Sequence, residues 1–159
     1  VECRRVLFRS AQMRKLAEAG CEQKVEWHPN LSFADKLKFF RNLTVLSVPA
    51  TYGEAFGLYL LEAMASGVPV VQPDHGAFPE IIGMTGCGVL CRPDDPSALA
   101  DALENLLLDD HAREQMTNRG IQGVRSEFSV ARMAERFEEV LMAARERTVP
   151  AGVHEHSGA

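Results

Sequence analysis

Two short apolar runs on either side of a helical segment constrain the fold of this chain more than any other feature. Residues 43–48 (LTVLSV) and 68–72 (VPVVQ) are rich in β-branched side chains and are bounded by Pro or Gly. Continuous runs of this kind are typical of parallel strands buried on both faces, whereas a half-exposed hairpin alternates polar and apolar residues. Between them, helix-forming residues extend from Glu54 or Ala55 to Ser66 and stop at Gly67. The pattern predicts a βαβ unit.

The rest of the chain continues the alternation of strands and helices. Short strands are expected at 25–27 and 89–91, with a glycine-rich loop at 83–88 before the second of them. Helices are expected at about 12–19, 32–40, 78–82, 95–108, 111–125 and 130–146. Gly20 predicts a left-handed helix end, whereas Ser32, Asp95-Pro96 and Ser129 predict helix starts. This order predicts an α/β fold with a Rossmann-like parallel sheet flanked by helices.

Composition excludes several classes of protein. A chain of 159 residues with 46% hydrophobic residues can bury one ordinary core. The net charge of -5 argues against a nucleic-acid surface. The four cysteines lack the spacing of a metal site, so reduced thiols in a cytoplasmic protein are expected. The apolar stretch 55–72 contains Glu62, Gly67 and Pro69, which argues against a membrane span.

The two ends of the chain differ from the part between them. Residues 4–10 (RRVLFRS) resemble the translation of a sequencing-adapter oligonucleotide, and the first residue is Val. We therefore expect residues 1–10 to be a processing artefact. The tail 148–159 contains Pro150 and shows no apolar periodicity, which predicts disorder. The domain is expected to span residues 11–147.

Two carboxylates at the central helix are the strongest candidates for chemistry. Glu62 is the only charged residue between Ala55 and Gln72, and Glu54 precedes it by eight positions. On one helix, eight residues advance about 12 Å and turn about 80°, so both side chains could reach one elongated ligand. The amides of Phe56, Gly57 and Leu58 are expected in the first turn, where a helix attracts phosphate. A ligand with a diphosphate between two sets of hydroxyls fits this arrangement, and a nucleotide sugar is such a ligand.

The same residues belong to a recognisable series. The segments EAFGL (54–58) and EAMASGVPVV (62–71) are followed by GAFPEII (76–82), GCGVL (86–90) and PDDP (93–96). In order and spacing this series resembles the E-x7-E signature and following motifs of family 4 (group 1) glycosyltransferases, over roughly residues 21–145.

The resemblance implies a truncated C-terminal, donor-binding domain of a GT-B fold. It implies retaining transfer of a sugar from a nucleotide-sugar donor to a glycan or lipid-linked acceptor, without a metal or other cofactor. By position, Glu54 is the catalytic-site residue at the donor sugar and Glu62 binds the ribose, while Phe56, Gly57 and Leu58 bind the diphosphate. Peripheral membrane association of a full-length parent is a further expectation.

Other polar residues have weaker claims to the site. His75 is a candidate donor contact, with backbone hydrogen bonding in its loop as the alternative. His28 and Asn30 lie where the family places a loop near the nucleotide base. Tyr52, Glu80 and Arg92 fall near the expected cleft, with solvated or capping roles as the alternative.

The chain also departs from the family pattern. Two strands that open the family's domain are absent, together with an Arg and a Lys that neutralise the donor phosphates and the acceptor-binding N-terminal domain. We therefore expect 25–27 to be unpaired or mispaired, 43–48 to have an exposed edge, and the isolated chain to be inactive. A noncatalytic nucleotide-binding module and a fragment of a GT-B nucleotide-sugar epimerase are the alternatives.

Overall fold

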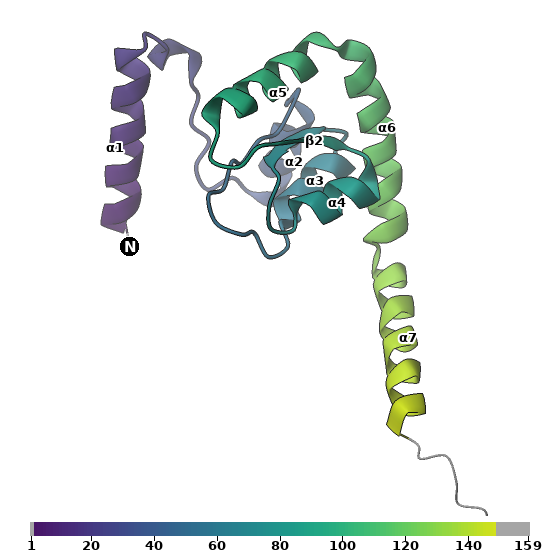
Figure 1. Ribbon diagram of the computed structural model, residues 1–159. Helices are drawn as coiled ribbons and strands as arrows, with labels where there is room; N and C mark the ends of the chain where they lie inside the picture. Colours follow the sequence, from purple (N-terminus) through teal and green to yellow (C-terminus); the bar gives the residue numbers. More distant parts are fainter. Residues whose placement is uncertain (1, 149–159) are drawn as a thin grey trace, which may run out of the picture. The chain divides into compact units, whose positions relative to one another are not determined.

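The computed structural model describes the backbone of residues 2–148 and the side chains of residues 10–145 (Figure 1). The expected tail is therefore almost wholly outside the described residues. The chain divides into two compact units, residues 1–35 and 36–159.

The first unit contains one long helix and a short turn of 3-10 helix. Helix α1 (Glu2–Glu18) begins ten residues before the expected start at residue 12. It includes most of residues 1–10, and the proposed artefactual origin of these residues stays a prediction. Gly20 has φ +64°, and the N–H groups of Gly20 and Cys21 donate to the carbonyls of Ala17 and Leu16. These bonds form the predicted left-handed C-cap.

The expected strand at 25–27 is absent. The 3-10 helix η1 (Glu22–Lys24) comes first, and Val25 has an extended backbone that joins no ladder. An extended segment needs a hydrogen-bonding neighbour to become a strand. The prediction that this segment is unpaired is confirmed.

The second unit contains a small parallel sheet. Strand β1 (Val70–Pro73) pairs with β2 (Gly88–Cys91) in parallel, with Val70 opposite Gly88. The expected strand at 43–48 is reduced to one parallel bridge between Leu46 and Val70. Beyond that bridge, the buried side chain of Gln72 hydrogen-bonds to the N–H and C=O of Val48 at 3.2 and 2.8 Å. The Gln72 side chain thus takes the place of backbone pairing between strands at Val48. The strand predicted at 43–48 was therefore predicted too long.

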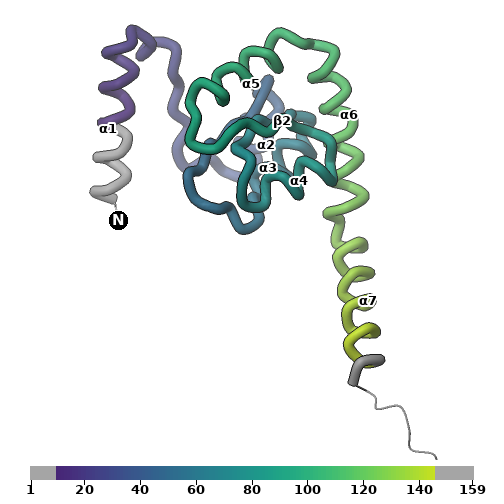
Figure 2. Tube along the Cα trace, in the orientation of Figure 1, coloured from purple at the N-terminus to yellow at the C-terminus, as the bar shows by residue number. Residues whose placement is uncertain are grey.

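The described residues 33–148 form six helices, of which α7 extends away from the strands (Figures 1 and 2). In chain order they are α2 (Phe33–Arg41), α3 (Leu58–Ala65), α4 (Phe78–Thr85), α5 (Pro96–Leu108), α6 (Asp110–Glu127) and α7 (Val130–Thr148). Helix α4 was predicted to end at Ile82 but continues to Thr85. It ends there because the next residue, Gly86, has a left-handed backbone with φ +62°. The loop predicted at 83–88 is therefore reduced to residues 86–87.

The core lies between α3, α4, α6 and the strands. Among its fully buried members are Leu60, Met64, Val70 and Phe78. Helix α6 approaches closely because Gly120 has no side chain: a Cβ there would lie 2.4 Å from Cys87 Sγ. This core fixes α3, the helix that contains Glu62.

Candidate functional site

The loop that contains Glu54 leaves the carboxyl end of the Leu46 bridge. Its backbone is held by the turn after β1, where the N–H of Ala77 donates to the carbonyl of Glu54 at 2.9 Å. Gly76 has φ +59°, and a Cβ there would lie 2.7 Å from the Glu54 nitrogen. Only glycine combines this backbone conformation with so close an approach. Gly76 therefore positions Glu54.

The side chain of Glu54 turns back toward the start of α3. The N–H of Phe56 donates to Oε1 and the hydroxyl of Tyr59 donates to Oε2, each at 3.3 Å. Burial of the phenol, followed by the negative charge of Glu54, raises the pKa of Tyr59 to about 12. Tyr59 therefore stays protonated and remains a donor to the carboxylate. Sequence reasoning missed Tyr59, whose only signal was its place within one turn of the helix start.

The helix begins later than expected. We expected it from Glu54 or Ala55, but α3 starts at Leu58, and its N-cap Gly57 has a left-handed backbone (φ +74°). Phe56 and Gly57 thus precede the helix, and Glu54 and Glu62 do not share one. The single-helix geometry predicted for the two carboxylates is wrong, because a left-handed residue cannot continue a right-handed helix.

The three predicted phosphate-binding amides also differ from one another. The N–H of Phe56 is occupied by Glu54. The N–H groups of Gly57 and Leu58 donate to no described residue. Two of the three amides are therefore open to a ligand at the N-terminus of α3.

Glu62 lies in the middle of α3 and is half-buried. Lys36 Nζ on α2 contacts Glu62 Oε1 at 2.6 Å, with the two side chains 35% and 38% exposed. Among the described residues nothing donates to the other carboxylate oxygen, Oε2. Lys36, 26 positions upstream, was not foreseen as the partner of Glu62.

The structure gives His75 a role within its loop. Its Nε2 lies 2.8 Å from the carbonyl oxygen of Ala50, and its ring lies 5.7 Å from that of Phe78. This contact is the backbone hydrogen bond that we gave as the alternative. His75 thereby ties the turn after β1 to the loop leading to Glu54, and a donor contact stays a prediction.

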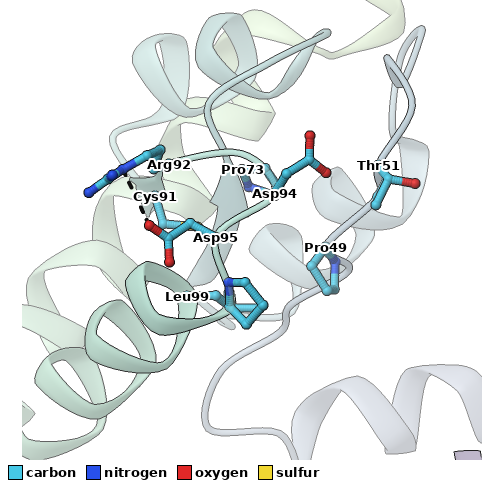
Figure 3. A pocket seen from close by; sticks show the side chains of 10 residues that line it. Pro49, Thr51, Pro73, Cys91, Arg92, Asp94, Asp95 and Leu99 are labelled. Carbon is cyan, nitrogen blue, oxygen red and sulfur yellow. Dashed lines mark ion pairs between the residues drawn. The ribbon is translucent and has the colours of Figure 1, made fainter.

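A separate hollow of about 430 Å³ lies at the carboxyl ends of the strands (Figure 3). It is lined by residues 49–51, Pro73, the end of β2 and the start of α5, and by none of the predicted catalytic or donor-binding residues. Arg92 Nε lies 3.4 Å from Asp95 Oδ2, and Asp95 accepts from the N–H of Ala98. Arg92 thus supports a helix cap, which agrees with the capping alternative.

The remaining candidates have simpler surroundings. Tyr52 is exposed, and Glu80 lies in the first turn of α4. In the first unit, His28 Nε2 lies 3.1 Å from Glu26 Oε2, and Asn30 has φ +53°. A ligand contact of these four residues stays a prediction.

Two further features bear on the chemistry available. In the part of the chain with described side chains, no cluster of His, Cys, Asp and Glu has the arrangement of a metal site. Burial raises the pKa of the Cys87 thiol to about 12, and it also raises that of Cys91. Both sulfurs are free thiols held in the neutral form.

Along residues 2–148, no helix combines the length and apolar character needed to cross a bilayer.

The second unit thus has a parallel α/β fold, with one carboxylate before a central helix and one within it. The family model "Glycosyl transferases group 1" matches residues 9–123, and the chain belongs to this family. It is 35% identical over 136 residues to the D-inositol 3-phosphate glycosyltransferase of Corynebacterium diphtheriae, covering 78% of this chain and 31% of that protein. The chain therefore spans about a third of the length of such relatives.

Solved structures agree with this assignment. The C-terminal domain of a group 1 glycosyl transferase from Francisella tularensis superposes with a TM-score of 0.67 at 27% identity, covering 80% of this chain and 65% of that chain. Anabaena HepE in complex with UDP superposes with a TM-score of 0.73 at 21% identity, covering 84% and 36%. The fold is that of GT-B glycosyltransferases.

Proposed function

We propose that this chain is the donor-binding part of a retaining glycosyltransferase, which passes a sugar from a nucleotide-sugar donor to a glycan or lipid-linked acceptor. The observation that carries the proposal is the pair Glu54 and Glu62, placed before and within α3 inside the family match. The proposal includes a metal-independent reaction in the cytoplasm. Catalysis is assigned to the full-length protein, not to this chain alone.

Each carboxylate has acceptor positions left for hydrogen bonds from the donor. Glu62 would bind the ribose hydroxyls through Oε2, which accepts no hydrogen bond from the described residues. Glu54 would bind hydroxyls of the donor sugar while keeping its bonds to Phe56 and Tyr59, because a carboxylate has about four acceptor positions. The reaction centre therefore needs no large movement of either side chain.

The diphosphate is assigned to the start of α3. The N–H groups of Gly57 and Leu58 are available there, and the helix dipole favours negative charge. Phe56 would join them only if Glu54 released its N–H. We therefore assign the main contacts to Gly57 and Leu58.

Calorimetric titration of the chain with UDP, GDP and ADP tests the proposal. UDP is the first choice because the similarly folded Anabaena protein binds it. Glu62→Gln should weaken binding at least about tenfold, because a hydrogen bond to a charged group contributes roughly 1.5–3 kcal/mol. Glu104→Gln, an exposed change on α5, is the matched control and should bind as the unaltered chain does.

Circular dichroism of each variant must show the same helix content as the original chain. Unchanged affinity of Glu62→Gln would remove the ribose role. Failure of all three nucleotides to bind the unaltered chain would overturn the donor-binding assignment itself.

A further inference from the structure

We propose that Lys36 is a positioning residue for nucleotide recognition, acting through Glu62. The inference rests on the proposed function, since it assumes that Glu62 binds the ribose. It concerns the residue that holds the carboxylate in place and not the carboxylate itself.

The core of the second unit brings Lys36 and Glu62 together. Lys36 on α2 and Glu62 on α3 are 26 residues apart in sequence, yet Nζ and Oε1 are only 2.6 Å apart. Helix α2 is anchored by Phe40, which is 5% exposed and packs in the same core as Leu61 and Ala63 of α3. Because both helices are fixed to one core, the ammonium holds the carboxylate in one orientation.

The two carboxylate oxygens of Glu62 differ in their surroundings. Lys36 contacts Oε1 and leaves Oε2 without a donor among the described side chains. A carboxylate with one oxygen held and the other open accepts a hydroxyl without first losing rotational freedom. Vicinal hydroxyls of a ribose are the ligand chemistry that suits it, because each can donate one hydrogen bond.

The charge of Lys36 also bears on the binding of a diphosphate. A diphosphate at Gly57 and Leu58 would be repelled by a nearby uncompensated carboxylate. The Lys36 ammonium neutralises Glu62 locally and reduces this repulsion.

A merely structural bridge between α2 and α3 is the competing explanation. Such a bridge would affect every nucleotide equally. An ion pair with both partners about a third exposed contributes little to stability, so variants at Lys36 should still fold. Recognition of the ribose hydroxyls therefore separates the two explanations.

The experiment compares calorimetric affinities for UDP and 2′,3′-dideoxy-UDP. In the unaltered chain UDP should bind more tightly, and Glu62→Gln should abolish the preference. Lys36→Met should reduce the preference by about threefold to tenfold, a coupling typical of residues in contact. Lys36→Arg keeps the charge and should retain most of it.

Two controls make the result specific. Lys38→Met makes the same change at an exposed position on α2 and should leave the preference intact. In the Glu62→Gln background, Lys36→Met should have no further effect on the preference, because Lys36 acts through that carboxylate. Thermal melting of every variant checks that folding is unaltered.

The outcomes distinguish the inference from the proposed function. If Glu62→Gln loses the preference and Lys36→Met keeps it, the role of Lys36 is overturned while the ribose role of Glu62 stands. Equal loss of affinity for both nucleotides in Lys36→Met also overturns it in favour of a structural bridge. If the unaltered chain binds neither nucleotide, or binds both equally, the ribose role fails and the inference fails with it.

Discussion

Tyr59 and Glu54 form a phenol–carboxylate pair at the start of α3. The hydroxyl donates to Oε2 at 3.3 Å, and burial together with the carboxylate charge raises the phenol pKa from 10.0 to about 12. The folded state therefore prefers the protonated phenol. Its contribution to stability is complete below about pH 10 and is lost as the pH rises toward 12.

Glu54→Gln should lower the pKa of Tyr59, because the change removes the negative charge that opposes ionisation. Burial remains, so the pKa should stay above 10.0. Tyr52→Phe leaves Tyr59 as the only tyrosine and makes the ultraviolet absorbance of tyrosinate specific to it. At about pH 11 roughly a tenth of Tyr59 should be ionised, and a larger fraction after Glu54→Gln.

The same titration in urea should show an ordinary phenol with and without the substitution. If the pKa of Tyr59 in the folded chain were the same before and after Glu54→Gln, the pairing would be contradicted. Circular dichroism at each pH confirms that the signal comes from folded chain.

The sequence indicated the two carboxylates, Glu54 and Glu62, but it did not indicate their partners, Tyr59 and Lys36. Glu54 and Glu62 could be recognised from their spacing of eight residues, which is a property of the local sequence. Lys36 meets Glu62 because α2 and α3 contribute residues to one core, and the sequence between the two residues does not specify that arrangement. Tyr59 reaches Glu54 only because the helix begins at Leu58.

Helix α3 owes its starting point to one backbone conformation. Gly57 has φ +74°, where an L side chain is strained, and a Cβ would lie 3.3 Å from Leu60 Cδ1. Gly83, inside α4, has an ordinary helical backbone and nothing within 4 Å of an added Cβ. The two glycines therefore form a matched pair for testing the helix start.

Gly57→Ala should lower the free energy of unfolding by about 1–2 kcal/mol, the usual cost of a left-handed backbone for a residue with a side chain. Gly83→Ala should raise it by about 0.4–1 kcal/mol, because alanine reduces the entropy of the unfolded chain. Urea denaturation followed by circular dichroism measures both. Equal effects of the two substitutions would show that Gly57 does not determine where α3 begins.

Three helix starts were more predictable than the strands. Ser32 Oγ accepts from the N–H of Asp35, Asp95 from that of Ala98 and Ser129 from that of Arg132, as their side chains indicated. A cap depends on three or four neighbouring residues, so local sequence suffices. A strand, in contrast, needs a neighbouring strand. On the side of β1 away from β2, the described residues form only the bridge between Leu46 and Val70.

Across the second unit, burial is distributed unevenly. Helices α3, α4 and α6 enclose the core, whereas α7 has large apolar side chains in solvent, including Val130 at 78% and Phe137 at 63% exposed. The α/β class and parallel register were predictable, because continuous apolar runs require cover on both faces. The amphipathic pattern of α7 indicated a helix but not whether its apolar face is covered.

We expect α7 to be the least stable helix of the second unit. Most of the stability of a helix in a protein comes from packing of its apolar face, and α7 buries little of that face. Hydrogen exchange followed by mass spectrometry should find amides of residues 130–145 exchanging at least about 100-fold faster than those of β1 and α4, whose opening requires disruption of the core.

A chain ending at Ser129 is the control for this expectation. It should keep the protection of β1 and α4 and melt within a few degrees of the original chain, because α7 contributes little burial. Protection of α7 equal to that of α6 would contradict the expectation. If that protection declined on dilution, a second copy of the chain would be the cover, since a contact within one chain does not depend on concentration.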